Sequence, residues 1–296
     1  MWCKFPKVAA LLILRRYVDD IAKSTKSKQE LTEETSKILK EKLDMSIKGW
    51  AFAGEKPPAD ISKDGISVDI GGNTWYTESD LFTLNNPPLC FEKKKRGKQP
   101  AGSVYFDPKT MNLGKFVPHQ LTRRMVTSSL AKVWDLRGKL TPVTLKFKYD
   151  LRRLINEAPI SSQARALWLQ NFNIMEETRN FVYVRCTRPA DALRFTCRLW
   201  VLVDAAEWGM IVTVYVGWER KNGSYSCSHL FGKGLLGPEA LTLPQKELHI
   251  LSVGADITEL LSVMLEEWVE EVLVAGDSEI ALCCAPYFPI NETLSC

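Results

Sequence analysis

The sequence predicts a mixed α/β fold, of the α+β kind, and three observations support this. Stretches rich in β-branched and aromatic residues alternate with stretches of helical period, in the order strands, helix, strand, helix. No internal repeat is present, which argues against a solenoid. The chain has 296 residues, of which 45% are hydrophobic, and this is ordinary for a soluble globular protein of two or three domains.

The first third is predicted to contain a hairpin, a helix and further strands. Residues 8–23 predict an apolar strand, a tight turn at two aspartates and a return strand. SKQELTEETSKILKEKLDM (27–45) has its aliphatic residues on one side, which predicts an amphipathic helix. SIKGWAFAG (46–54) predicts a strand that ends in glycine, and ISVDIGGNTWYTESDLFTL (66–84) predicts two strands around a Gly-Gly turn.

The middle of the chain is predicted to be helical. After the basic loop EKKKRGKQP, residues 122–158 predict a helix and then a break at DLRGKLTP. A second helix is expected to begin at Pro142, because proline is favoured in the first helical turn.

The last third changes to a β-rich character. Residues 192–230 carry many β-branched and aromatic residues, with RKNGS as a hairpin turn. Residues 243–272 predict a long helix that is broken near Gly254. EVLVAGDSEIALCC (271–284) then predicts a strand that ends at an aspartate, followed by the start of a helix.

Charge is segregated along the chain, although the net charge is only +4. Residues 93–153 hold 16 lysines and arginines against three acidic residues, whereas residues 196–296 hold five against 14. A basic segment suits a phosphate backbone, and an acidic segment suits cations or is simply solvated. The run KKKRGK could be only a solvated loop, but it opens a segment with Trp134, Phe147 and Tyr149, which favours nucleic-acid binding. The candidate nucleic-acid-binding residues are Lys93, Lys94, Lys95, Arg96, Lys98, Arg123 and Arg124.

Other classes of protein are disfavoured. The eight cysteines form no CxxC pair and the three histidines have no zinc-ligand spacing, so we expect reduced thiols in an intracellular protein, cytoplasmic or nuclear. The N-terminal apolar run is too short to span a bilayer and lacks a signal-peptide cleavage site, so we expect no membrane association and no secretion. Neither Asp64 nor Asp69 lies in the Asp-Thr/Ser-Gly context that an aspartic protease needs.

Two groups of acidic residues could bind a metal. Asp19 and Asp20 are adjacent and repel each other, so they form either a solvated turn or half of a metal site. In the last third the candidates are Asp204, Glu247 and Asp277.

These three acids can converge if one lies in a central strand, one in the adjoining helix and one at a neighbouring strand end. Oxygen-only ligands favour Mg²⁺ or Mn²⁺, and two such ions could activate water for phosphodiester cleavage. The simpler alternative is that Asp277 caps a helix, Glu247 is an exposed first-turn acid and Asp204 ends its strand.

Six blocks, in order along the chain, resemble the Pol polyprotein of BEL/Pao-type long-terminal-repeat retrotransposons. RYVDDI resembles the YxDD turn of the polymerase, and SIKGWAFAG resembles the palm strand that follows it. DLRGKLTPVTLKFK is similar to DPLGLLSPVTLKAK in the connecting region. VDAAEWG, LTLPQKEL and AGDSEIAL are similar to SDASE-YG, TIPRLEL and TDSTIVL in the RNase H domain.

The resemblance implies roles for the acidic residues. Asp19 and Asp20 would be two of three polymerase carboxylates. Asp204, Glu247 and Asp277 would be the first three RNase H carboxylates, with Mg²⁺ or Mn²⁺ held weakly if at all.

The chain also departs from the family pattern. It begins 18 residues before Asp19 and ends 19 residues after Asp277, so we expect the remaining catalytic acids to be missing. Within the blocks, Arg137 stands where the family has proline and Ala206 where it has serine. We therefore expect an idle polymerase site and very slow or absent RNA cleavage.

The implied organisation is a palm remnant at 1–55, a basic thumb/connection-like region at 56–165, a linker at 166–195 and a truncated RNase H-like domain at 196–296. The expected function is that of a nucleic-acid-binding fragment derived from an RNA-directed DNA polymerase with RNase H. The expected partners are RNA/DNA hybrid or other duplex nucleic acid, and other Pol segments. The alternative is a domesticated, non-catalytic module that binds nucleic acid or protein.

Overall fold

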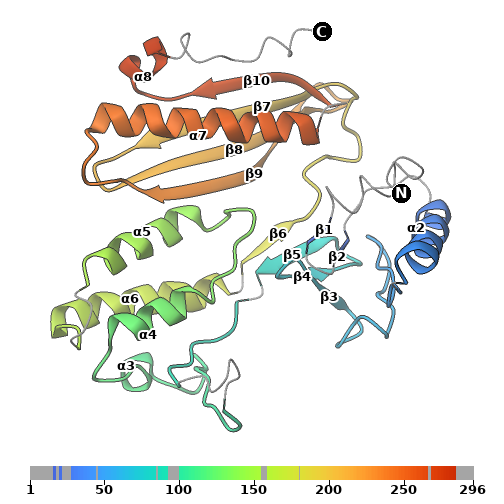
Figure 1. The fold of residues 1–296 in the computed structure, drawn as a ribbon. Coiled ribbons are helices and arrows are strands. Elements are labelled where there is room, and N and C mark those ends of the chain that lie inside the picture. Colours follow the sequence, from blue (N-terminus) through green and yellow to red (C-terminus); the bar gives the residue numbers. More distant parts are fainter. Residues whose placement is uncertain are drawn as a thin grey trace. The chain divides into compact units, whose positions relative to one another are not determined.

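The computed structural model describes residues 16–17, 20–21, 28–44, 46–84, 86–92, 100–154, 159–179, 181–265 and 268–284. The fold is mixed α/β, as the sequence predicts, with helices and two four-stranded sheets (Figure 1). The chain forms two compact units. Unit 1 comprises residues 1–85 and 180–185, and unit 2 comprises residues 86–179 and 186–296.

Unit 1 begins with the predicted hairpin and helix. Strands β1 (Arg16–Tyr17) and β2 (Asp20–Ile21) pair in antiparallel fashion, with Tyr17 opposite Asp20. Helix α2 (Lys28–Leu43) follows and buries Leu39. The prediction of a strand at 46–54 is wrong, because residues 46–52 form neither strand nor helix. Within unit 1, the end of this segment is tied instead to Thr77, by a backbone bond from Gly54 N to Thr77 O at 2.8 Å.

The sheet of unit 1 is antiparallel, in the order β3-β4-β5-β6. The predicted Gly-Gly turn joins its first two strands, and two further strands extend it. Its members are β3 (Ser67–Ile70), β4 (Asn73–Tyr76), β5 (Leu81–Leu84) and β6 (Val182–Val184). The chain thus leaves unit 1 after β5 and returns to it for β6.

Unit 2 starts with a helical layer whose core contains the fully buried Phe147, Trp168 and Phe172. The hydroxyl of Thr122 caps α4 and that of Ser161 caps α6, each accepting a bond from a backbone N–H in the first turn. The helices are α3 (Leu113–Phe116), α4 (Arg123–Leu130), α5 (Thr141–Arg152) and α6 (Ser162–Thr178). The two helices predicted within 122–158 are therefore present.

The stretch 166–195, which the sequence analysis describes as a linker, consists mostly of regular secondary structure, namely the greater part of α6 and then β6. Helix α6 is held because it contributes two of the largest buried side chains of the helical layer.

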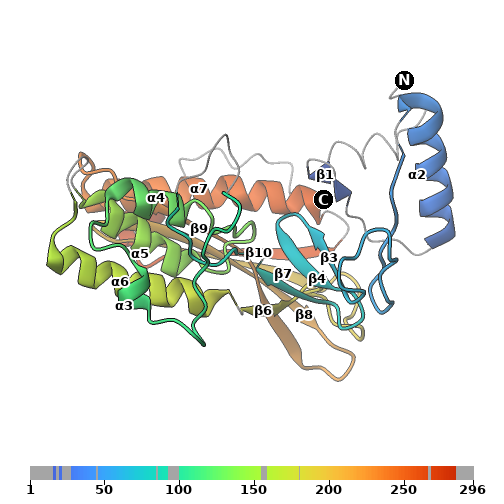
Figure 2. The same ribbon diagram turned by 90° about the horizontal axis from the view of Figure 1, so that it is seen from below.

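The second sheet of unit 2 has the order β10-β7-β8-β9. Strands β7, β8 and β9 form an antiparallel meander, and β10 pairs with β7 in parallel fashion. Helix α7 makes the crossover between β9 and β10 and covers one face of the sheet (Figures 1 and 2). The elements are β7 (Cys197–Ala205), β8 (Gly209–Glu219), β9 (Tyr225–Leu236), α7 (Leu243–Met264), β10 (Val269–Ala275) and α8 (Glu279–Cys284).

Helix α7 is continuous, so the prediction of a break near Gly254 is wrong. A Cβ atom at Gly254 would lie 2.9 Å from Val203 Cγ1, closer than real contacts allow. The glycine therefore lets α7 pack closely against β7, and it does not interrupt the helix.

Helices α7 and α5 pack on opposite faces of this sheet. Side chains alternate along a strand, and the buried Val201 and Val203 of β7 belong to the core beneath α7. Leu145 of α5 lies against Gly209 of β8 and Gly234 of β9, which belong to the other face. The even-numbered side chains of β7 therefore share a face with α5.

The DLRGKLTP segment attaches α5 to β9. Gly232 N donates to Arg137 O at 2.9 Å, and Lys139 Nζ donates to His229 O at 2.6 Å. Gly138 has a φ of +65°, and a Cβ atom there would lie 1.8 Å from Gly232 O. Only a glycine permits this close approach of two backbones.

In the part of the chain that the structure describes, no helix has both the length and the apolar composition that a membrane span requires.

Candidate functional site

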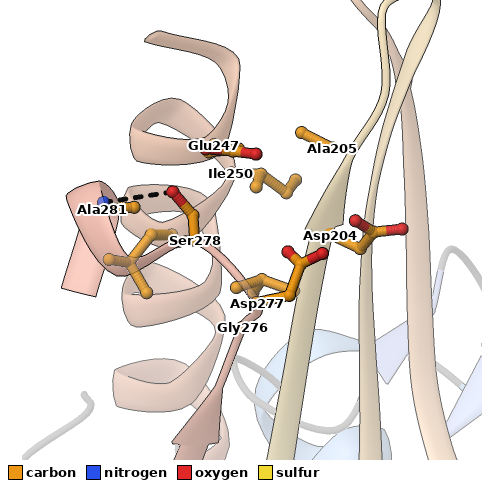
Figure 3. A pocket seen from close by; sticks show the side chains of 10 residues that line it. Asp204, Ala205, Glu247, Ile250, Gly276, Asp277, Ser278 and Ala281 are labelled. Carbon is orange, nitrogen blue, oxygen red and sulfur yellow. Dashed lines mark hydrogen bonds between the residues drawn. The ribbon is translucent and has the colours of Figure 1, made fainter. Parts of the chain in front are cut away.

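The three acidic residues singled out in the last third line one pocket (Figure 3). Asp204 is the next-to-last residue of β7, Glu247 lies near the start of α7, and Asp277 follows the end of β10. The pocket is lined by Val203, Asp204, Ala205, Glu247, Ile250, Leu251, Gly276, Asp277, Ser278 and Ala281.

The parallel register brings two of the acids together. Ala275 at the end of β10 lies opposite Leu202 of β7, so both strands end at the same edge of the sheet. Parallel pairing therefore places Asp277, two residues beyond β10, beside the end of β7.

The start of α7 is anchored at the same edge. Thr242 and Gln245 form a capping box, in which Thr242 N donates to Gln245 Oε1 at 2.9 Å. The buried Lys246 donates from Nζ to Glu207 O at 2.6 Å and so ties the first turns of α7 to the turn after β7. Glu247 is the next residue, and its position relative to β7 follows from this contact.

The three side chains differ in direction and exposure. Asp204 and Asp277 are exposed, and Glu247 is half-buried. Figure 3 shows the Asp204 carboxylate turned away from α7, as expected because its neighbour Val203 packs beneath that helix. Across the described ranges, no group of three or more histidine, cysteine or acidic side chains is already arranged to hold a metal ion.

The chemistry of the lining nevertheless fits a hard divalent cation. Its ionisable groups are three carboxylates, and none of the ten lining residues is lysine, arginine or histidine. Mg²⁺ and Mn²⁺ prefer such oxygen ligands.

The alternative role considered above for Asp277 is that of a helix cap, here at the start of α8. The N–H of Ala281 bonds instead to the hydroxyl of Ser278, at 3.2 Å.

Other predicted site residues lie elsewhere. Asp19 lies outside the described residues, and of Asp20 the structure describes the backbone pairing with Tyr17. On α4, Arg123 donates from Nη1 to Leu154 O at 3.3 Å, whereas the side chain of Arg124 is exposed. The predicted loop residues outside the described ranges are Lys93, Lys94, Lys95, Arg96 and Lys98.

Asp64, considered above as a protease aspartate, is a turn residue. Its carboxylate accepts bonds from the Ser67 hydroxyl and from the backbone N–H groups of Ile66 and Ser67. These bonds, that of the Ser67 hydroxyl first, hold the pKa of Asp64 well below its usual value.

The structure shows one contact, at the end of β7 where the pocket lies, that the sequence analysis did not predict. Trp208, in the turn after β7, has its ring centroid 5.0 Å from that of Tyr149 on α5. The signal available was an exposed aromatic residue next to a candidate acid, but no sequence pattern links residues so far apart.

A model of the Pao retrotransposon-like RNaseH-like domain matches residues 122–278. The match confirms the resemblance of the motifs that lie within these residues, and it includes α4 and α5 as well as the sheet with the three acids. No curated protein matches the chain. Among solved structures, the foamy viral protease-reverse transcriptase in complex with double-stranded DNA aligns over 98% of this chain, with 11% identity and a TM-score of 0.41. The aligned part spans 42% of that chain's length.

Proposed function

Because the chain belongs to the Pao retrotransposon-like RNaseH-like domain family, we propose that it is a segment of a retrotransposon Pol polyprotein that binds duplex nucleic acid, in particular RNA/DNA hybrid. Its pocket binds Mg²⁺ or Mn²⁺ weakly, and its cleavage of RNA in a hybrid is very slow or absent. One observation carries this proposal, namely that Asp204, Glu247 and Asp277 reach the same pocket from three different elements.

The three carboxylates act together as ligands of one divalent cation. Asp204, Glu247 and Asp277 hold the cation, which when bound supplies an activated water and stabilises the leaving oxygen. Without a cation, the three negative charges repel one another. A bound cation therefore relieves repulsion and stabilises the folded chain.

The expected binding is weak because the acids approach from different sides. Asp204 belongs to the sheet face opposite α7, whereas Glu247 extends from α7 itself (Figure 3). An ion could contact both only beyond the end of β7, after the side chains rotate, and this ordering costs conformational entropy.

A thermal melting series with and without Mn²⁺ tests the metal proposal. At a concentration ten times its Kd, the ion should stabilise the native chain by about 1.4 kcal/mol. Asp204→Asn should abolish this response, and it should raise the metal-free melting temperature if repulsion is relieved. Asp256→Asn is the matched control, because Asp256 is an exposed aspartate of α7 that does not line the pocket.

Equal Mn²⁺ responses of the native chain and Asp204→Asn would end the metal proposal. In that case the alternative, a non-catalytic nucleic-acid-binding module, would be preferred if hybrid binding persists. Loss of hybrid binding at low salt as well would leave a protein-interaction role. We also predict that the polymerase carboxylates Asp19 and Asp20 are catalytically idle. Primer extension on an RNA template by the purified chain would disprove this prediction.

A further inference from the structure

The sheet face that carries Asp204 also carries a row of residues leading to α5. Asp204 of β7 lies opposite Ile211 of β8, and Ile211 lies opposite Gly234 of β9. Gly234 O in turn accepts a bond from Lys148 Nζ of α5 at 3.4 Å. Neighbouring strands are about 4.8 Å apart, so Gly234, which Lys148 contacts, lies two strands or about 10 Å from Asp204.

Helix α5 presents a basic ridge along this face. Beside Lys148, Arg152 donates from Nη1 to Gly237 O at 2.7 Å, and Arg153 at the end of the helix is exposed. No carboxylate among the described residues forms an ion pair with any of these three side chains. Their positive charge is therefore not neutralised by that part of the chain.

An aromatic pair connects the ridge to the pocket. Trp208 has 38% of its surface exposed and lies in the turn that directly follows β7, four residues after Asp204. Its ring packs against Tyr149, and the Arg153 guanidinium carbon lies 5.6 Å from the centroid of the Tyr149 ring. Aromatic rings beside arginine are typical of surfaces that bind nucleic acid without sequence preference. The bases of a duplex are already stacked on one another, so these rings would contact the sugars and phosphates of its backbone.

We propose that Lys148, Arg152 and Arg153, together with the Tyr149–Trp208 pair, form a backbone-binding ridge for duplex nucleic acid. Helix α5 and the turn after β7, which carries Trp208, would bind the backbone of one strand of a hybrid. Another phosphate of the same duplex would then reach the carboxylate pocket. The inference rests on the proposed function, and it adds a substrate-binding face that is distinct from the predicted basic loop at 93–98.

The spacing is consistent with this role. Successive nucleotides of one strand advance by about 3.4 Å along the duplex axis, so the distance of about 10 Å corresponds to roughly three nucleotides. The negative pocket alone would repel a phosphate backbone, whereas the ridge attracts it. A bound divalent cation would reverse the sign at the pocket.

The test measures binding of a fluorescent RNA/DNA hybrid by anisotropy at several salt concentrations. The ridge variant is Lys148→Gln with Arg153→Gln. Arg152 is left unchanged because its bond to Gly237 O, at 2.7 Å, is much shorter than the bond of Lys148 to Gly234 O, at 3.4 Å. We expect the affinity at low salt to fall about tenfold, and the slope of log K against log salt to flatten by about two, because about 0.9 counterions are released per phosphate contact.

The matched control is Lys221→Gln with Lys233→Gln, which removes the same charge. Lys233 lies opposite Val212, whose side chain belongs to the core beneath α7, so Lys233 lies on the other face. Lys221 lies in the turn between β8 and β9. We expect this control to change the affinity less than twofold and to keep the slope.

A second variant separates the aromatic contact with the backbone from the effect of charge. Trp208→Ala should weaken binding several-fold without changing the salt slope, because it removes no charge, and Trp208→Phe should restore most of the affinity. Melting curves show which variants are folded, and only folded variants enter the comparison.

The outcomes separate the two proposals. If the native chain binds no hybrid at any salt concentration, the nucleic-acid role and the ridge are both overturned. If it binds, but the ridge and control variants lose equal affinity and slope, the ridge alone is overturned. A selective loss in the ridge variant supports it.

Discussion

Replacing Gly138 by alanine should destabilise unit 2 strongly, because two backbones meet at this residue. The new Cβ would lie 1.8 Å from Gly232 O and 2.7 Å from Thr141 Oγ1, and neither of the two can move alone. The left-handed φ of +65° costs an alanine about 1 kcal/mol. Opening the bond from Gly232 N to Arg137 O costs about 1 kcal/mol more, and displacing α5 adds a packing loss of 1 to 3 kcal/mol. We expect a total of roughly 3 to 5 kcal/mol.

Gly223→Ala is the matched control for backbone conformation. Gly223 has a φ of +77°, but no atom lies within 4 Å of its added Cβ, so only the cost of about 1 kcal/mol applies. Urea unfolding can be followed by tryptophan fluorescence, because six of the nine tryptophans belong to unit 2. Equal losses of stability in the two variants would refute the close approach at Gly138. A larger loss in Gly138→Ala, by about 2 kcal/mol or more, supports it.

Three further predictions concern packing, pH and salt. Gly254→Val should lower the free energy of unfolding by about 2 kcal/mol, since its side chain would collide with Val203 beneath α7; unchanged urea curves would contradict this contact. Burial, and then the charge of Lys139, lower the pKa of His229 from 6.5 to about 4. As the pH falls, the unfolded chain therefore takes up this proton before the folded chain does. The stability contributed by neutral His229 is complete above pH 6.5 and is lost as the pH falls toward 4. His229→Gln should remove that part of the pH dependence of the free energy of unfolding, roughly 2 kcal/mol for this partly exposed ring. Alanine at the four basic residues 93–96 should flatten the salt dependence of hybrid binding, and an unchanged slope would exclude this loop from the interface.

Local pattern was sufficient for most of the elements of unit 2. The β-branched and aromatic content of 192–230 and the turn RKNGS correspond to the meander of β7, β8 and β9, and Pro142 lies in the first turn of α5. Pattern failed where tertiary contacts decide. At Gly254 a close contact with β7 explains the glycine, and residues 46–52, although strand-like in composition, have no strand partner among the described residues.

The site could be anticipated only in part. The sequence suggested that Asp204, Glu247 and Asp277 converge, and the structure brings them to one pocket; their role as metal ligands stays a prediction. The face on which Asp204 lies follows from strand alternation, but the position of α5 on that same face does not. It depends on the contacts of Leu145 with two glycines of neighbouring strands, and single-sequence patterns do not encode such pairings.

The mixed pairing of the sheet has a consequence for how the pocket is assembled. The meander of β7 to β9 joins segments adjacent in the chain, whereas β10 must return across α7 to lie beside β7. Closing that long loop costs entropy before any new contact repays it, so we expect β10 to join the sheet late in folding. Pulsed hydrogen exchange should then show protection of β7 and β8 amides before those of β10. Asp277 depends on this last pairing for its place beside Asp204, so the carboxylates remain apart while most of the sheet forms, and their mutual repulsion opposes only the final step.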